Sequence, residues 1–217
     1  MRRAPTFVQK IKLTRARRSN NDATVAQSWR VRGTSSRKPR PALDSEALQR
    51  LALHYVGRYA TTRARLHAYL DRKIAERGWA EEGDPDTGAI VARFAELGYV
   101  DDRGFALARA ASLQRRGYGE RRIAPSLRAA GLAESAIAEA RASTVPGALR
   151  AALDFARRRH IGPFAREIID RAARERALAA MIRAGHGFDL ARQIVDSEPG
   201  CVPEQDDWDG AEINVSN

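Results

Sequence analysis

The 217-residue sequence predicts an all-α protein built from three tandem three-helix repeats. Alanine and arginine, both good helix formers, are abundant, and aromatic residues make up only 6% of the chain. No run of β-branched residues alternates with period two over more than a few positions. From residue 43 to residue 196 apolar residues instead recur with the helical period, and the pattern returns after roughly 50 residues. Stacking of such units predicts an elongated, curved body.

The first expected repeat covers residues 43–98 and contains three helices. Its apolar stripes are Leu48, Leu51, Ala52, Tyr55 and Tyr59, then Leu66, Leu70 and Ile74, then Ile90, Phe94 and Leu97. Asp44 or Ser45 is the candidate N-cap of the first helix, and Thr61 or Thr62 that of the second. Gly78 and Gly98 are expected to end the second and third helices.

The second expected repeat covers residues 99–143 and shows the same pattern most clearly. Its helices are expected over about 102–116, from near Gly119 to Gly131, and then around Ile137. The segment TTRARLHAYL matches YGERRIAPSL in frame, so that Thr62, Leu66 and Leu70 correspond to Gly119, Ile123 and Leu127. Pro125 is unfavourable in a helix unless it lies close to the first turn.

The third expected repeat, residues 144–196, is a looser copy. Its first stripe runs from Leu149 to His160, and its last contains Phe188, Ala191 and Val195. Between them we expect one helical stretch from about Pro163 to Ala184, an enlarged second helix compared with the other repeats. The sequence MIRAG at its end resembles LRAAG at residues 127–131.

Charge divides the chain into a basic arm, a moderately basic body and an acidic tail. Residues 1–42 hold 12 basic residues and one acid, whereas residues 196–217 hold seven acids and no base. Both ends lack helical periodicity, so we expect 1–42 and 197–217 to be disordered. An arginine-rich transit peptide and a start codon assigned too early are the alternatives for the arm.

Composition also bounds the compartment and the chemistry of the protein. The single cysteine, Cys201, excludes a disulfide framework within one chain and fits a reducing cytoplasm. No apolar stretch approaches the roughly 20 residues of a membrane span. The four histidines show no metal-ligand spacing, and no phosphate loop or nucleophile motif is present. We therefore expect no enzymatic activity, no metal and no cofactor.

Two adjacent acids, Asp101 and Asp102, form a candidate carboxylate pair for catalysis or metal binding. A catalytic pair needs a third element, such as a metal ligand or a pocket that separates the two pKa values. An aspartate just before a helix instead accepts a backbone N–H bond, worth about 1 kcal/mol. We interpret the pair as the start of a helix.

Arginine clusters recur on corresponding helices of the three repeats. Each cluster has two readings: a solvated helix face, or a surface that meets phosphate or an acidic protein groove. Because the clusters recur on corresponding helices, the sequence supports a partner-binding surface as strongly as a solvated helix face. The candidate filament- or DNA-contacting residues are Arg63, Arg65, Arg115, Arg116, Arg121, Arg122, Arg128, Arg157, Arg158 and Arg159. Tyr118, between two clusters, can stack on a base or pack at the turn.

The motifs LGYVDDRGFA, RRGYGERRI and LRAAGL, taken together, resemble the RecX family of recombination regulators. The segments ALQRLALHYVGRYATTRARLHAYL and RRRHIGPF extend the resemblance to about residues 44–196. It implies a cytoplasmic bacterial protein of three three-helix repeats, without an active site, that binds the RecA recombinase filament on DNA. Such proteins damp recombinase, ATPase and co-protease activity in recombination, DNA repair and the SOS response.

The resemblance leaves one rival function open: a helical protein that binds DNA without sequence preference and without a recombinase partner. The charge balance distinguishes the two, because residues 43–217 contain 26 basic and 26 acidic residues. A dedicated duplex binder usually concentrates positive charge in its folded body. We expect a monomer whose partner is the filament, with direct contact to single- or double-stranded DNA as a further possibility through the basic surface and the arm.

Overall fold

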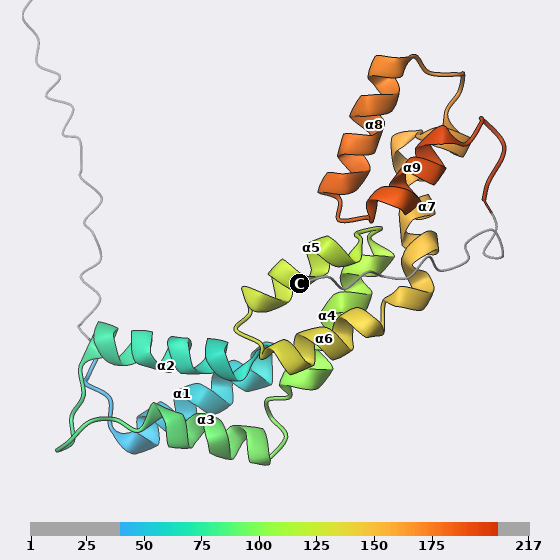
Figure 1. The fold of residues 1–217 in the computed structure, drawn as a ribbon. Coiled ribbons are helices and arrows are strands. Elements are labelled where there is room, and N and C mark those ends of the chain that lie inside the picture. The colour runs from blue at the N-terminus through green and yellow to red at the C-terminus, as the bar shows by residue number, and fades with distance from the viewer. Residues whose placement is uncertain (1–39, 204–217) are drawn as a thin grey trace, which may run out of the picture. The chain divides into compact units, whose positions relative to one another are not determined.

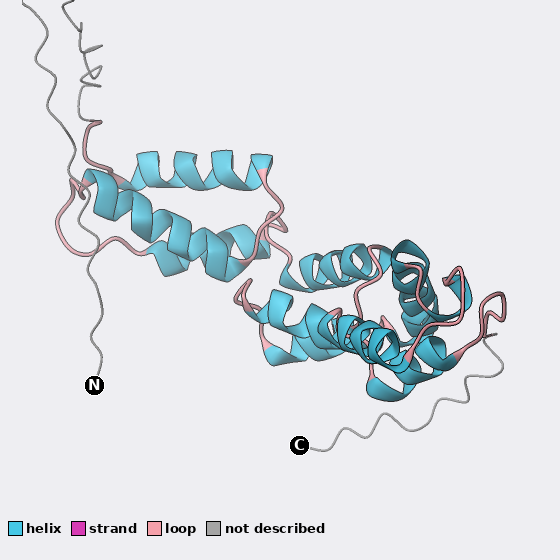
Figure 2. Cartoon of the chain, turned by 90° about the horizontal axis from the view of Figure 1, so that it is seen from above, coloured by secondary structure: helices cyan, strands magenta, loops and turns pink. Residues whose placement is uncertain are grey.

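The computed structural model describes residues 40–203, and these residues form helices joined by turns and loops (Figures 1 and 2). No strand is assigned within this range; the one extended pairing is an isolated bridge between Leu43 and Trp79. The predicted all-α class is therefore confirmed. Most of the predicted basic arm (1–39) and acidic tail (204–217) lies outside the described residues. The α-helices are α1 (Ser45–Arg58), α2 (Arg63–Arg77), α3 (Thr87–Glu96), α4 (Asp102–Arg115), α5 (Glu120–Arg128), α6 (Glu134–Ala142), α7 (Ala148–Arg159), α8 (Arg171–Arg183) and α9 (Phe188–Asp196).

Helices α1, α2 and α3 form the first unit around one hydrophobic cluster. Local sequence starts each helix: Asp44, Thr62 and Asp86 accept backbone N–H bonds from the residues three positions later, at 2.7, 3.2 and 2.8 Å. Leu66 and Leu70 are fully buried on α2, at the positions that the helical stripe predicted. The other fully buried members are Leu43, Leu48 and Ala52.

Helices α4, α5 and α6 form the second unit. Ile123 and Leu127 of α5 are fully buried, as are Leu66 and Leu70 of α2, so the in-frame match of the two segments corresponds to equivalent buried positions. Pro125 is the sixth residue of α5 rather than a first-turn residue. It removes one helical N–H donor there, and α5 extends only to Arg128.

Helices α7, α8 and α9 form the third unit, and here one prediction is wrong. The stretch 163–184 is not one helix: Gly162–Phe164 is a 3-10 turn, residues 165–170 are irregular, and α8 begins at Arg171. Asp170 starts α8 by accepting a bond from the amide of Ala173 at 2.6 Å. Ile168, which fitted the helical spacing, is 79% exposed. There is accordingly no enlarged second helix around 166–177.

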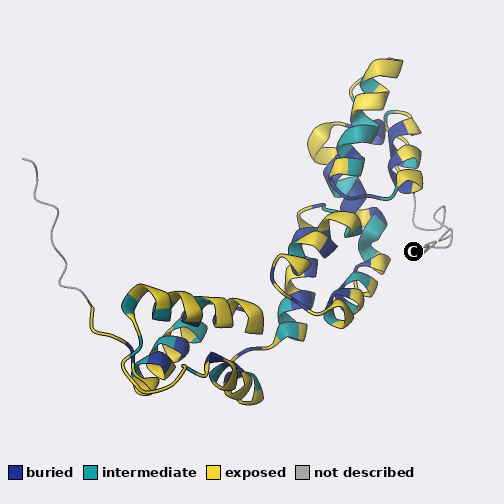
Figure 3. Ribbon diagram, turned by 60° about the vertical axis from the view of Figure 1, so that its left-hand side comes forward, coloured by how far each residue is buried: buried dark blue, intermediate teal, exposed yellow. Residues whose placement is uncertain are grey.

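Buried residues line the inward side of every unit (Figure 3). The three hydrophobic clusters draw on residues 43–100, 106–140 and 149–195 respectively, and half-buried Tyr118 packs against both the second and the third. Each unit thus has a core of its own. Because the three cores are separate, polar contacts between neighbouring units contribute to holding the units together.

Candidate interaction surface

The two aspartates that open α4 cap two different helices. The Asp101 carboxylate accepts from the amide of Gly104 at 2.9 Å, within its own helix. The Asp102 carboxylate accepts from the amide of Arg63 at 2.9 Å, in the first turn of α2. Both carboxylates satisfy amides that a helix start leaves without an intrahelical partner. The interpretation as a helix start is confirmed for Asp101, and Asp102 adds a link between units.

The first junction joins the start of α2 (residues 61–65) to the turn after α5 (residues 130–131). The Thr62 hydroxyl donates to the Ala130 carbonyl at 2.6 Å, in a buried position. Gly131 has φ +73° and faces Ala64 so closely that a Cβ at residue 131 would collide with the Ala64 methyl. Only glycine meets both requirements without strain.

The second junction repeats this arrangement one unit further along. Residues 117–122 form the turn that leads into α5 and its first residues. They contact residues 184–186, which follow α8. The amides of Gly119 and Arg121 donate to the carbonyls of Ala184 and Gly185, at 3.0 and 3.1 Å. A Cβ on Gly119 would lie 2.6 Å from the amide nitrogen of His186 and closer still to the Gly185 carbonyl. The glycines of the RGYG motif therefore allow backbone to pack on backbone.

His186 closes the second junction from within the third unit. His186 is only 2% exposed, its Nε2 lies 3.2 Å from the Gly117 carbonyl, and its ring centroid is 5.6 Å from that of Phe155. Burial lowers the pKa of His186 to about 4, and the neighbouring Arg158 acts in the same direction. The imidazole is therefore neutral at pH 7, and its Nε2–H donates to the Gly117 carbonyl.

The structure brings arginines from the second and third units together at this junction. The Arg158 guanidinium, from α7, donates to the Arg116 carbonyl at the end of α4. The Arg122 guanidinium lies 4.9 Å from the Tyr118 ring centroid and 3.4 Å from the Arg183 carbonyl. The junction cluster comprises Arg116, Arg121, Arg122, Arg158 and Arg183. All five residues are exposed, and none has an ion-pair partner within residues 40–203.

The remaining predicted arginines fall into three environments. Arg63 and Arg65 lie at the first junction, with the Arg65 guanidinium 5.4 Å from the Phe105 ring centroid. Arg157 and Arg159, at the end of α7, lie over the rings of Phe164 and Phe155 at 4.9 and 5.6 Å. Arg115 is exposed beside Arg116.

Arg128 is the one predicted contact residue that is neutralised locally. It forms a bidentate pair with Glu134 across the turn between α5 and α6, with its Nε 2.6 Å from the carboxylate. The hydrogen bond between them lowers the pKa of Glu134 below its ordinary value and raises that of Arg128. Its charge is therefore less available to a partner than those of the junction cluster.

Sequence reasoning missed two arginines that belong to these surfaces. Arg183 joins the junction cluster, and Arg109 of α4 lies with Arg65 in a hollow at the first junction. The sequence did contain a signal for Arg183. This residue lies two positions before the glycine of MIRAG, the segment that matches LRAAG. Nothing in the local sequence marked Arg109.

Within residues 40–203, no group of three or more histidine, cysteine or acidic side chains is placed to hold a metal ion. In that same range no helix has both the length and the apolar character needed to cross a membrane.

Comparison with known proteins identifies the family. Residues 101–140 match the family model described as RecX, second three-helix domain. The chain is 34% identical over 167 residues to the regulatory protein RecX of Myxococcus xanthus, covering 70% of this chain and 86% of that protein. This chain belongs to the RecX family. The resemblance seen in the sequence motifs is thereby confirmed.

Two solved RecX structures share the fold. The crystal structure of RecX from Lactobacillus salivarius aligns with a TM-score of 0.54 at 15% identity, over 70% of this chain and 94% of that one. A second crystal structure, of a regulatory protein RecX, aligns with a TM-score of 0.52 at 20% identity, over 70% of this chain and 74% of that one. The matched family domain contains both aspartate caps and the RGYG turn.

Proposed function

We propose that this protein binds the RecA–DNA filament in the cytoplasm, as a monomer, and lowers the recombinase, ATPase and co-protease activity of the filament. The observation that carries the proposal is the relation to a regulatory protein RecX at 34% identity over most of both chains. In this proposal the protein regulates recombination, DNA repair and the SOS response through binding, and has no catalytic step of its own.

The junction cluster supports the proposal physically. Five exposed arginines from two units lie in or beside the turns where backbone hydrogen bonds join the start of α5 to the end of α8. Positive charges without local carboxylate partners suit an acidic groove or the phosphates that a nucleoprotein filament exposes. Contact by successive units with adjacent recombinase subunits would fix their geometry or block addition at the growing end.

The test is the rate of DNA-dependent ATP hydrolysis by the recombinase. Substoichiometric amounts of this protein should lower the rate, because one molecule at a growing end or in a groove affects many subunits. An unchanged rate at equimolar protein contradicts the proposal.

Charge reversal tests whether the junction cluster makes the contact. Arg121→Glu with Arg122→Glu should weaken inhibition at least tenfold, since the side chains of both residues are exposed. The matched control is Arg166→Glu with Arg176→Glu, an equal charge change at exposed arginines of the third unit outside the cluster. Equal inhibition by both double variants would show that the junction arginines are merely solvated.

A second candidate function, DNA binding without a recombinase, is favoured by one observation. Residues 1–42 carry 12 bases against one acid, a charge that binds DNA without sequence preference and with steep salt dependence. Neutralising those bases by glutamine in the full chain should flatten the dependence of DNA affinity on salt. If inhibition of ATP hydrolysis persists in that variant, DNA binding by the arm is separate from the regulatory function.

A further inference from the structure

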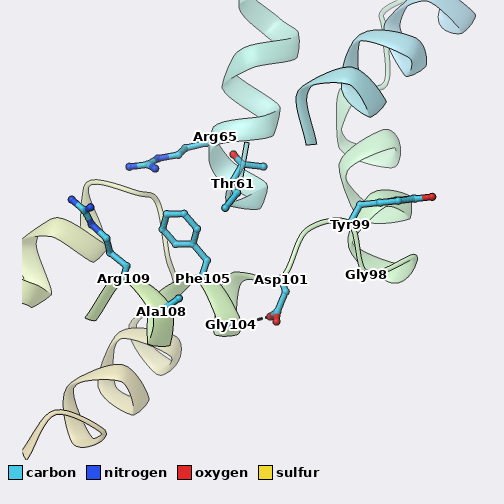
Figure 4. A pocket seen from close by; sticks show the side chains of 10 residues that line it. Thr61, Arg65, Gly98, Tyr99, Asp101, Gly104, Phe105, Ala108 and Arg109 are labelled. Carbon is cyan, nitrogen blue, oxygen red and sulfur yellow. Dashed lines mark hydrogen bonds between the residues drawn. The ribbon is translucent and has the colours of Figure 1, made fainter. Parts of the chain in front are cut away.

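An open hollow of about 620 Å³ lies at the first junction, between the start of α2 and the first half of α4 (Figure 4). It lies apart from the second junction and its arginine cluster. Its lining combines cationic, aromatic and hydroxyl groups. The residues that matter for its chemistry are Thr61, Arg65, Tyr99, Asp101, Phe105 and Arg109.

The two guanidinium groups in the hollow form no ion pair with the described part of the chain. The Arg65 guanidinium lies over the Phe105 ring, and that of Arg109 reaches only the Ser126 hydroxyl, at 3.3 Å. Neither pairs with a carboxylate among residues 40–203. Figure 4 shows both guanidinium groups on one side of Phe105 and Asp101 on the other. The Asp101 carboxylate is itself engaged by the amide of Gly104.

A buried hydroxyl in the same lining lacks a partner among residues 40–203. Thr61 is 6% exposed, and its Oγ1 makes no hydrogen bond within that range. An unsatisfied buried polar group costs about 1–3 kcal/mol, so a bound group that accepts or donates there gains by pairing it. This second observation, independent of the arginines, points to a ligand that completes the hollow.

Tyr99 connects the hollow to an apolar groove on the first unit. Tyr99 is 54% exposed and also lines a depression of about 430 Å³ between α1 and α3. Leu53 and Leu97 of that groove are 51% and 59% exposed. Large apolar side chains this exposed and this close together are typical of a binding surface. The combined surface therefore offers two cations next to an apolar strip.

This combination fits an acidic peptide that also carries apolar side chains better than it fits a nucleic acid. Two arginines, with Asp101 nearby, supply too little net positive charge for a phosphate backbone, whose binding rests on many phosphate contacts. Carboxylates pair with guanidinium groups in planar, bidentate geometry, and an aromatic side chain stacks on them.

The chain itself contains a segment with this chemistry. Residues 204–217 carry five acids, no base, one tryptophan and two β-branched apolar residues. The acids are Glu204, Asp206, Asp207, Asp209 and Glu212, and the apolar residues are Trp208, Ile213 and Val215. We propose that the segment 204–217 binds the hollow of its own chain, with its carboxylates on Arg65 and Arg109 and its apolar residues toward Tyr99. Its 14 residues reach at most about 48 Å when extended.

A peptide titration tests the affinity. The host is the full chain with the five tail acids replaced by their amides, which removes self-competition. A fluorescein-labelled peptide of residues 204–217 should bind this host at least tenfold more tightly than it binds the unmodified chain. Arg65→Glu with Arg109→Glu should weaken binding at least tenfold, Thr61→Val at least twofold, and the control pair Arg166→Glu with Arg176→Glu less than twofold.

Photo-cross-linking from position 208 of the unmodified full chain locates the segment. A benzophenone side chain replacing Trp208 should form cross-links within residues 99–109 of the same molecule. No binding of the peptide at 100-fold molar excess, equal binding of its amide form, or equal losses in both charge-reversed pairs would overturn the proposal. Cross-links found only between two copies would overturn binding within one chain. Binding of a 14-nucleotide DNA in the hollow, where the peptide does not bind, would assign the hollow to nucleic acid. None of these outcomes depends on the proposed filament binding.

Discussion

Substituting Gly119 by alanine should separate the second and third units locally. Gly119 has φ −83° and ψ 170°, an extended conformation that alanine adopts without strain. The effect of Gly119→Ala therefore comes mainly from the new methyl group, which would lie 2.6 Å from the His186 amide nitrogen and nearer to the Gly185 carbonyl. Both neighbours are backbone atoms, so a side-chain rotation cannot relieve the contact.

The loss of stability in Gly119→Ala depends on the contacts that break when the two turns move apart. Separating the two turns loses the bonds from Gly119 to Ala184 and from Arg121 to Gly185, which contribute about 0.5–1.5 kcal/mol each. Overpacking adds about 1–3 kcal/mol. The free energy of unfolding should therefore fall by about 2–6 kcal/mol in total. For a chain of this size, at about 2–4 °C per kcal/mol, that lowers Tm by roughly 4–24 °C.

Thermal unfolding of the full chain, followed by circular dichroism, measures this loss. The control is Gly57→Ala, because Gly57 lies in α1 and a Cβ added there would meet nothing within 4 Å, so alanine should stabilise the helix by about 0.5–1 kcal/mol. A Tm of Gly119→Ala within 1 °C of the parent would refute the close backbone contact at the second junction.

Two further predictions concern the junctions. Thr62→Val removes both the bond to the Ala130 carbonyl and the cap to the Arg65 amide, and should lower the free energy of unfolding by about 1–3 kcal/mol. Thr62→Ser keeps the hydroxyl and should retain most of the stability. Urea unfolding compares the two variants, and equal losses of stability would contradict the role of the hydroxyl. The pKa of His186 is about 4 in the folded chain and about 6.5 in the unfolded chain. Between pH 4 and pH 6.5 the unfolded state therefore binds a proton that the folded state does not. The contribution of His186 to stability is complete above pH 6.5 and falls by about 1.4 kcal/mol per pH unit on acidification toward pH 4. Urea midpoints at pH 7 and pH 5 measure this slope, which should become smaller in His186→Gln and would be equal in both proteins if the ring were exposed to solvent.

Sequence alone predicted the fold where local interactions determine it. The N-caps Asp44 and Thr62 were each predicted as one of two adjacent candidates, and Asp101 as one of a pair at a helix start, because capping involves a side chain and an amide three residues later. The helical stripes identified fully buried residues such as Leu66 and Ile123. Periodicity failed for 163–184, since Phe164 and Ile168 have helical spacing although the chain there turns at Pro163 and starts a new helix only after Asp170.

The candidate site was predictable only in part, because contacts between units link residues far apart in the chain. Sequence reasoning selected Arg116 and Arg158 separately, but their contact bridges 42 positions and has no local signature. Likewise Asp102 looked like a cap for α4, whereas its carboxylate serves Arg63, 39 positions earlier. The Arg128–Glu134 pair joins residues six positions apart across the turn between α5 and α6, and it was overlooked because this separation is not a helical spacing.

The most direct test of the central claim compares two affinities at one salt concentration: that for the RecA filament on single-stranded DNA and that for the same DNA without recombinase. A filament regulator should bind the filament at least tenfold more tightly, and Arg121→Glu with Arg122→Glu should reduce that preference. Equal affinity for both, or tighter binding to naked DNA, would contradict the claim and favour a DNA-binding protein that acts alone.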